Sequence, residues 1–149
     1  MIEQQDSEQF PGSQQAQLIV PTDLSLLSTQ VLPWFDQLYQ SSISSGVWLR
    51  CKLALAEAFS NVIRYAHRDL SPSTSIKIEV TVDPQHLEIR VWDYGRPFDF
   101  NKKLQEKLTS ISPEDGGGRG LKLMYDIADE LSYNRIGDQQ NCLLLVKFF

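Results

Sequence analysis

The sequence predicts an α+β domain, a two-layer α/β sandwich in which helices cover one face of a mixed, mostly antiparallel sheet. Residues 75–82 and 87–92 alternate apolar and polar side chains, as half-buried strands do. Residues 131–136 and 142–149 form a second strand pair, and the last run is apolar enough for a central strand. Residues 47–66 instead repeat apolar side chains every three or four positions, which is typical of an amphipathic helix.

The chain begins with a polar segment. Residues 1–15 are rich in Gln and Ser, so we expect a disordered tail before a single domain that spans residues 16–149. Residues 17–20 are a candidate edge strand. Thr22 is the expected N-cap of a first helix, and Pro33 must kink this helix or break it in two.

The helix predicted at residues 47–66 has one apolar face that should pack on the core, and Ser45 is its expected N-cap. The members of this apolar face are Trp48, Cys51, Leu55, Phe59, Val62 and Ala66.

Glu57 and Asn61 lie on a different face of this helix, and their side chains point the same way because they are four residues apart. Leu53 and Ala54 continue this face, so a carboxylate and a carboxamide stand among apolar neighbours. Each costs about 1–3 kcal/mol when it is buried without a partner. Mg²⁺ suits the amide oxygen of Asn61, and a reacting hydroxyl suits a carboxylate that accepts a proton. The alternative is an exposed polar face without a ligand.

Asp93 closes the second strand of the first hairpin, whose turn is predicted at residues 83–86. Gly95 and Pro97 follow at once and direct the chain away from the sheet. A carboxylate at a strand end can accept a hydrogen bond from an exocyclic amine such as adenine N6, and Gly95 lets the backbone approach a flat ring. The alternative is a turn-forming Asp-x-Gly that binds nothing.

Residues 116–120, Gly-Gly-Gly-Arg-Gly, precede a further amphipathic helix. Free amides at a helix start favour phosphate, and Arg119 and Lys122 can add positive charge. The spacing of a P-loop and the register of G-x-G-x-x-G are both missing, so neither motif is present. A flexible hinge without a ligand is the alternative. Residues 99–115, which precede the glycine-rich segment, are polar and contain a predicted helix at 102–108. This composition is typical of a lid.

In this order the three segments resemble the N, G1 and G2 boxes of the GHKL (Bergerat-fold) ATPase superfamily, and most closely its anti-sigma-factor serine kinase branch. The N box corresponds to residues 57–66, the G1 box to residues 93–99 and the G2 box to residues 117–124. The resemblance extends from about Leu18 to the C-terminus. In two places the chain departs from the pattern. The superfamily often has Gly at the position of Pro97, and many members of the branch have His at the position of Tyr65.

The resemblance implies that Glu57 is the general base, that Asn61 ligates Mg²⁺, that Asp93 binds the adenine of ATP, and that residues 117–120 meet the phosphates. The candidate nucleotide-binding residues are Asn61, Asp93, Gly95, Pro97, Gly116, Gly117, Gly118, Arg119, Gly120 and Leu121.

The same resemblance implies a serine/threonine protein kinase that phosphorylates a STAS-domain anti-anti-sigma factor and can sequester a sigma factor. Homodimers are frequent in this branch. Two alternatives remain: a nucleotide-gated binding module without significant kinase activity, and a small ATPase that acts on water. The lid, or a helical face around Trp34, Phe35 and Tyr39, is the candidate partner surface, although such aromatics also occur in cores.

Length, charge and composition exclude several classes of function. The 149 residues suffice for one core, and a formal net charge of −5 offers no basic field for nucleic acid. No apolar run reaches the roughly 20 residues of a membrane span, and the N-terminus lacks the basic start of a signal peptide, so we expect a cytoplasmic protein. His67 and His86 are not placed as phosphoacceptors of a sensor kinase. Cys51 and Cys142 are expected as reduced core residues.

Overall fold

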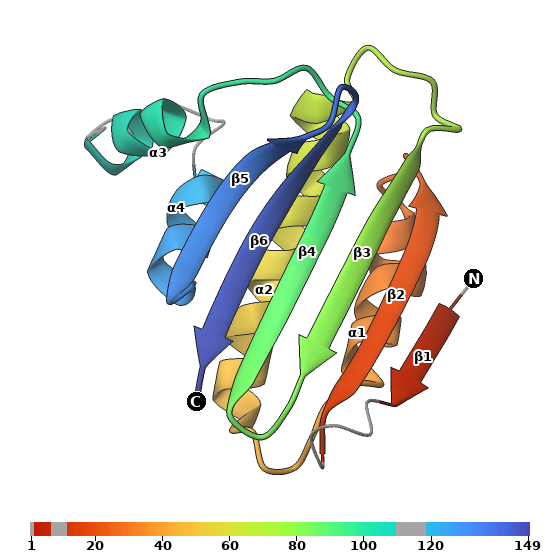
Figure 1. Ribbon diagram of the computed structural model, residues 1–149, viewed down its shortest axis with the longest axis vertical. Coiled ribbons are helices and arrows are strands. Elements are labelled where there is room, and N and C mark those ends of the chain that lie inside the picture. The colour runs from red at the N-terminus through yellow and green to blue at the C-terminus, as the bar shows by residue number, and fades with distance from the viewer. Residues whose placement is uncertain (1, 7–11, 110–118) are drawn as a thin grey trace.

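The computed structural model describes residues 2–6, 12–109 and 119–149 as two layers (Figure 1). One layer is a six-stranded sheet with the strand order β1-β2-β3-β4-β6-β5. Its strands are β1 (Ile2–Asp6), β2 (Gln14–Pro21), β3 (Ser75–Val82), β4 (His86–Asp93), β5 (Glu130–Ile136) and β6 (Gln140–Phe148). The predicted α+β sandwich is confirmed, but each of these strand pairings is antiparallel, so the described sheet is not mixed.

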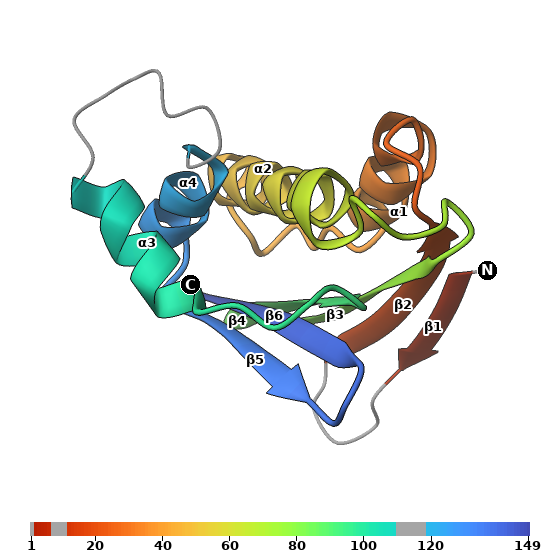
Figure 2. The same ribbon diagram turned by 90° about the horizontal axis from the view of Figure 1, so that it is seen from above.

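The other layer is helical, and Figure 2 shows α1, α2 and α4 on the same face of the sheet. The helical elements are η1 (Leu27–Val31), α1 (Leu32–Asp36), α2 (Ser45–Asn61), η2 (Val62–Ala66), α3 (Phe100–Thr109) and α4 (Arg119–Ile127). Both η elements are single π-helical turns: η1 leads into α1, and η2 extends α2. The long helix predicted at residues 47–66 is therefore confirmed. None of the described helices is both long and apolar enough to span a membrane.

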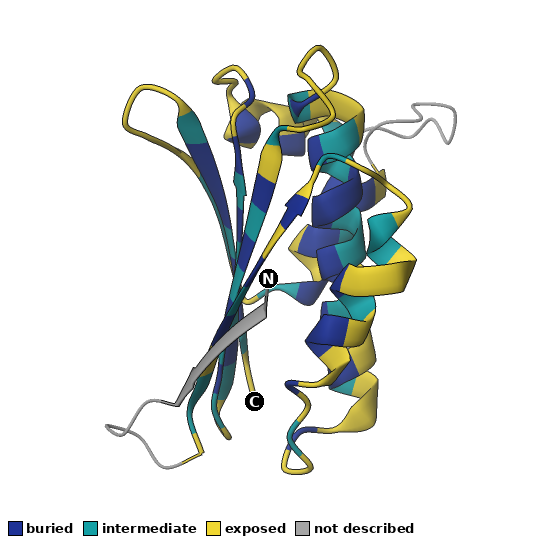
Figure 3. Cartoon of the chain, turned by 90° about the vertical axis from the view of Figure 1, so that its right-hand side faces the viewer, coloured by how far each residue is buried: buried dark blue, intermediate teal, exposed yellow. Residues whose placement is uncertain are grey.

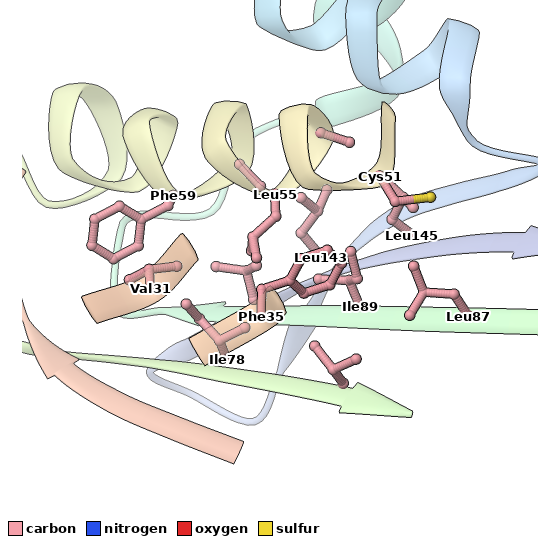
Figure 4. Close-up of a cluster of buried hydrophobic side chains, with 14 of the residues drawn as sticks. Val31, Phe35, Cys51, Leu55, Phe59, Ile78, Leu87, Ile89, Leu143 and Leu145 are labelled. Carbon is pink, nitrogen blue, oxygen red and sulfur yellow. The ribbon is translucent and has the colours of Figure 1, made fainter. Parts of the chain in front are cut away.

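The core lies between the two layers, where the buried side of each helix meets alternate residues of the strands (Figures 3 and 4). The predicted apolar face of α2 is buried, apart from the half-buried Ala66 at the end of η2. Cys51 and Cys142 are free buried thiols, as expected, and burial raises the pKa of each to about 11. Both thiols therefore remain protonated at neutral pH.

The N-terminal part differs from the expectation. The strand predicted at residues 17–20 is confirmed as part of β2, but its predicted edge position is wrong, because β2 lies between β1 and β3. Strand β1 and the start of β2 fall within residues 1–15, for which no regular structure was expected. The polarity of this segment is misleading because strand pairing uses backbone groups that every non-proline residue carries.

The helix starts also differ in detail. Ser44, and not Ser45, is the N-cap of α2, since its hydroxyl accepts a hydrogen bond from the backbone N–H of Val47. Thr22 caps no helix and instead bonds to His67 and to the carbonyl of Thr74. The first helix changes from the π-helical turn η1 to α1 next to Pro33, which lies in the first turn of α1, where its missing N–H is harmless.

Candidate functional site

A cavity of about 600 Å³ lies between the end of β4 and the helices α2, α3 and α4. This volume is within the range of ligand-binding pockets, roughly 300–1,000 Å³. Its wall includes four of the predicted site residues: Asn61 on α2, Asp93 on β4, Gly95 in the following loop and Leu121 on α4. Segments that are far apart in the sequence thus meet around one cavity.

Asp93, on the cavity wall, is only 1% exposed and accepts three hydrogen bonds. Its Oδ1 accepts from the backbone N–H of Gly95 and from Nδ2 of Asn141, both at 2.8 Å. Its Oδ2 accepts from the hydroxyl of Tyr133 at 2.7 Å. Three donors therefore fix the orientation of this carboxylate, which suits a group that recognises a ligand amine.

The hairpin of β5 and β6 also holds the loop that follows Asp93. The carbonyl of Gly95 accepts hydrogen bonds from Asn141 Nδ2 at 3.0 Å and from Arg135 at 2.8 Å. Arg135 bonds in addition to the carbonyl of Asp138 in the hairpin turn. A Cβ on Gly95 would lie 2.8 Å from the carbonyl oxygen of Ala66, so only glycine allows this close approach to the end of η2.

His67 fixes the same loop from the other side. The buried imidazole accepts a hydrogen bond at Nε2 from the backbone N–H of Tyr94, at 2.8 Å. Its Nδ1 lies 2.9 Å from the hydroxyl of Thr22, which donates to Thr74. This chain of bonds requires a neutral ring with its proton on Nδ1. Burial lowers the pKa of His67 and outweighs the opposing effect of Asp93, so the neutral form is favoured.

Glu57 and Gly120 meet beside Asn61, where α4 packs against α2. Asn61 belongs to the described cavity wall, whereas Glu57 and Gly120 lie behind it. A Cβ on Gly120 would lie 2.6 Å from Glu57 Oε2 and 3.4 Å from Asn61 Nδ2. Both polar side chains are half-buried, and within the described ranges neither has a side-chain hydrogen-bond partner. The N-box pair is thus close to the start of α4, whose backbone amides favour an anion.

Other predicted residues lie elsewhere. Pro97 is exposed and is not part of the cavity wall, and Arg119 and Lys122 are exposed on α4 outside that wall. Gly116, Gly117 and Gly118 lie outside the described residues. Arg96 and Lys103 are the cationic side chains that the described part of the wall contains.

Several residues at the site were missed by sequence reasoning. Tyr133, Arg135 and Asn141 come from the last hairpin, 40 or more residues after Asp93. A weak signal was available: Tyr133 and Arg135 alternate with polar neighbours in β5, and Asn141 is a carboxamide at the start of an apolar strand. What the sequence lacked was the register that pairs Asp93 with Asn141.

The proposed aromatic partner surface on the first helix is wrong in part. Trp34 is 1% exposed and Phe35 is fully buried, so both belong to the core. Tyr39 is 38% exposed, but its ring packs against Trp48 and its hydroxyl donates to the carbonyl of Ile43. These aromatics stabilise the packing of α1 on α2.

Comparison with known proteins supplies a family and a fold. Residues 20–147 match the family of histidine kinase-like ATPase domains. Relatives include the serine-protein kinase RsbW of Bacillus licheniformis, 34% identical over 86 residues, and that of Bacillus subtilis, 36% identical over 87 residues. These alignments cover 54% of this chain and 53% and 52% of the relatives, so the chain spans about half the length of the curated relatives it matches.

A solved structure has a similar fold. A chain from the crystal structure of the SiaB-SiaC complex from Pseudomonas aeruginosa superimposes with a TM-score of 0.60 and covers 89% of both chains. The two sequences are 13% identical, so this likeness concerns the fold alone.

Proposed function

Because the chain belongs to the family of histidine kinase-like ATPase domains, we propose that it binds ATP in the cavity and transfers the γ-phosphoryl group to a serine or threonine of a protein partner. The observation that carries this proposal is that Glu57 and Gly120 lie beside Asn61, which lines the same cavity as Asp93. A base-binding carboxylate and a phosphate-binding helix start thus share one cavity.

In the proposed complex Asp93 accepts a hydrogen bond from adenine N6, and the first turn of α4 at Gly120 and Leu121 meets the phosphates. Gly116, Gly117, Gly118 and Arg119 are proposed to extend this phosphate site.

Asn61 would hold Mg²⁺ through its amide oxygen. The fit is good because this side chain lines the cavity and makes no side-chain hydrogen bond with the described residues. Magnesium needs few protein ligands, since it retains waters and binds phosphates. When bound, it supplies positive charge that offsets the charge of the phosphates.

Glu57 would accept the proton of the incoming hydroxyl. The hydroxyl oxygen then forms a bond to the γ-phosphorus, and the bond from that phosphorus to the bridging oxygen of ADP breaks. The absence of a side chain on Gly120 leaves room for the Glu57 carboxylate beside the start of α4, since a Cβ there would lie 2.6 Å from Glu57 Oε2. Lys103 on the cavity wall is a further source of positive charge.

The partner follows from the relatives and from the sequence resemblance. The relatives are named serine-protein kinases, which supports a serine acceptor on a protein. The anti-sigma-factor branch supports a STAS-domain anti-anti-sigma factor as the substrate and a sigma factor as a second partner. A homodimer is proposed on the same ground.

The test is incubation of the purified protein with γ-labelled ATP and Mg²⁺, with and without STAS-domain proteins of the same genome. Label on a partner serine or threonine that is lost in Glu57→Ala is expected. Tight ATP binding without label on any partner would favour a nucleotide-gated binding module. Rapid ATP turnover without a partner would favour an ATPase that acts on water.

A further inference from the structure

The hydroxyl of Tyr133 meets the carboxylate of Asp93 on the wall of the cavity, at an O···O distance of 2.7 Å. We propose that these two residues form a pair that selects a 6-aminopurine over a 6-oxopurine, with Tyr133 as the positioning residue. This inference rests on the proposed binding of a nucleotide in the cavity, and it adds the determinant of base selectivity.

The first argument is the number of acceptor positions on Asp93. A carboxylate can accept about four hydrogen bonds, two at each oxygen. Gly95 and Asn141 fill both positions on Oδ1, and Tyr133 fills one on Oδ2. One acceptor position on Oδ2 remains for a ligand, beside the tyrosine hydroxyl.

The second argument concerns the single proton of Tyr133. Because this proton is donated to Asp93, the phenolic oxygen offers only lone pairs to the cavity. Burial, and next the Asp93 charge, raise the pKa of Tyr133 far above its usual value, so the proton is retained at neutral pH. The ring is stacked on Phe100, with 5.5 Å between centroids, and lies 5.0 Å from Phe98, which keeps the hydroxyl in place.

The third argument is that the neighbouring donors are already used. The backbone N–H of Gly95 donates to Asp93, and that of Tyr94 donates to His67. The amide of Asn141 donates to Asp93 and to the carbonyl of Gly95. A 6-oxo group would therefore face two acceptor oxygens with no free donor among these groups, whereas a 6-amino group could donate to both oxygens.

The experiment compares the affinities of ATP, inosine triphosphate and purine riboside triphosphate by titration calorimetry. These ligands carry an amino group, an oxo group and hydrogen at position 6. The unaltered protein should prefer ATP to inosine triphosphate by about 100-fold or more, with the hydrogen analogue between them. In Tyr133→Phe, which keeps the ring, the ratio of ATP to inosine triphosphate affinity should fall about tenfold, mainly through weaker ATP binding.

Tyr125→Phe is the matched control, because Tyr125 is exposed on α4 outside the described cavity wall. The ratio of ATP to inosine triphosphate affinity should not change in this variant. A purely structural role of Tyr133 would lower both affinities together, and an unchanged ratio in Tyr133→Phe would overturn the inference. If that variant does not fold, equal affinities for ATP and inosine triphosphate in the unaltered protein would overturn it instead. No ATP binding by the unaltered protein would refute the proposed function itself, which is a separate outcome.

Discussion

Two parts of the proposed site are built in different ways: the base end around Asp93 and the catalytic end around Glu57 and Asn61, each named for its proposed role. At the base end, Asp93 is buried and held by three donors from the loop after β4 and from the last hairpin. At the catalytic end, Glu57 and Asn61 are half-buried, and in the described ranges they are positioned by helix packing without side-chain hydrogen bonds. The proposed base-binding carboxylate is thus held in place by the protein, while Glu57 and Asn61 keep their hydrogen-bonding capacity for the proposed substrate.

Glycine shows the same contrast. A side chain on Gly95 would meet the backbone of Ala66, which cannot move without displacing η2. A side chain on Gly120 would meet the tip of Glu57, which can rotate away. A substitution at Gly95 would therefore disturb the fold, whereas one at Gly120 would displace the proposed base.

The largest expected effect is at the catalytic end. Glu57→Gln should reduce phosphoryl transfer to the partner by about 10²- to 10⁴-fold, because a general base is lost while the shape is kept. ATP affinity should change little. Transfer is measured with labelled ATP, and binding is measured by calorimetry. Glu130→Gln at the exposed start of β5, outside the described cavity wall, is the control. A similar loss of binding would show that Glu57 serves ATP affinity and not transfer.

The base end should respond in the opposite way. Asp93→Asn should weaken ATP binding by about 10- to 100-fold, since the new amide places an NH₂ group against one of the three donors and presents a poorer acceptor. The midpoint of thermal unfolding should also fall, because a buried donor loses its partner. Equal losses of binding in this variant and in Glu57→Gln would contradict the division of roles between the two ends.

Two glycine substitutions sharpen the contrast. Gly95→Ala should lower the free energy of unfolding by about 1–3 kcal/mol, the usual cost of overpacking. Gly120→Ala should leave stability unchanged or raise it by up to about 1 kcal/mol, because Ala favours a helix, yet transfer should fall as Glu57 is displaced. Urea unfolding and the transfer assay separate the two effects.

Gly46→Ala is the matched control, since its nearest contact would be an ordinary 3.6 Å to Ser44 Oγ. A loss of stability in Gly120→Ala as large as that in Gly95→Ala would mean that the carboxylate of Glu57 is as rigidly held as the backbone of Ala66.

The sequence predicts the parts of this molecule whose signals are local. The periodicity of α2, the alternation in β3 and β4 and the turn at residues 83–86 all depend on neighbouring residues, and each is confirmed. The spacing of Glu57 and Asn61 likewise places both on one side of α2. The N-terminal strand pairing was missed because it depends on backbone bonds between polar segments.

The base end depends on contacts that no local pattern contains. Tyr133, Arg135 and Asn141 reach Asp93 and Gly95 only because β6 pairs with β4 in one particular register. His67 was identified only as a residue unsuited to phosphoryl transfer, although it holds the loop after Asp93. Hydrogen-bond networks between distant segments are the part of a site that a single sequence conceals.

The smallest expected effect tests whether His67 helps to fix the base end. Because burial lowers the pKa of His67 from 6.5, the folded state binds this proton less well than the unfolded state. His67 therefore stabilises the fold fully above pH 6.5, and this contribution is lost as the pH falls toward its folded pKa. The free energy of unfolding should fall by at most about 1.4 kcal/mol per pH unit in this window.

Urea unfolding between about pH 5 and pH 8 measures this slope, a range in which histidine is the side chain that ordinarily titrates. The pKa of Asp83 is lowered from 3.8, so its contribution to the free energy of unfolding is lost only at pH values below this range. His67→Gln should flatten the slope. ATP affinity should fall only once the pH passes through the lowered pKa of His67 in the folded state, since only then is Nε2 protonated and unable to accept from Tyr94. A slope that persists in His67→Gln would remove His67 from the network that presets the base end.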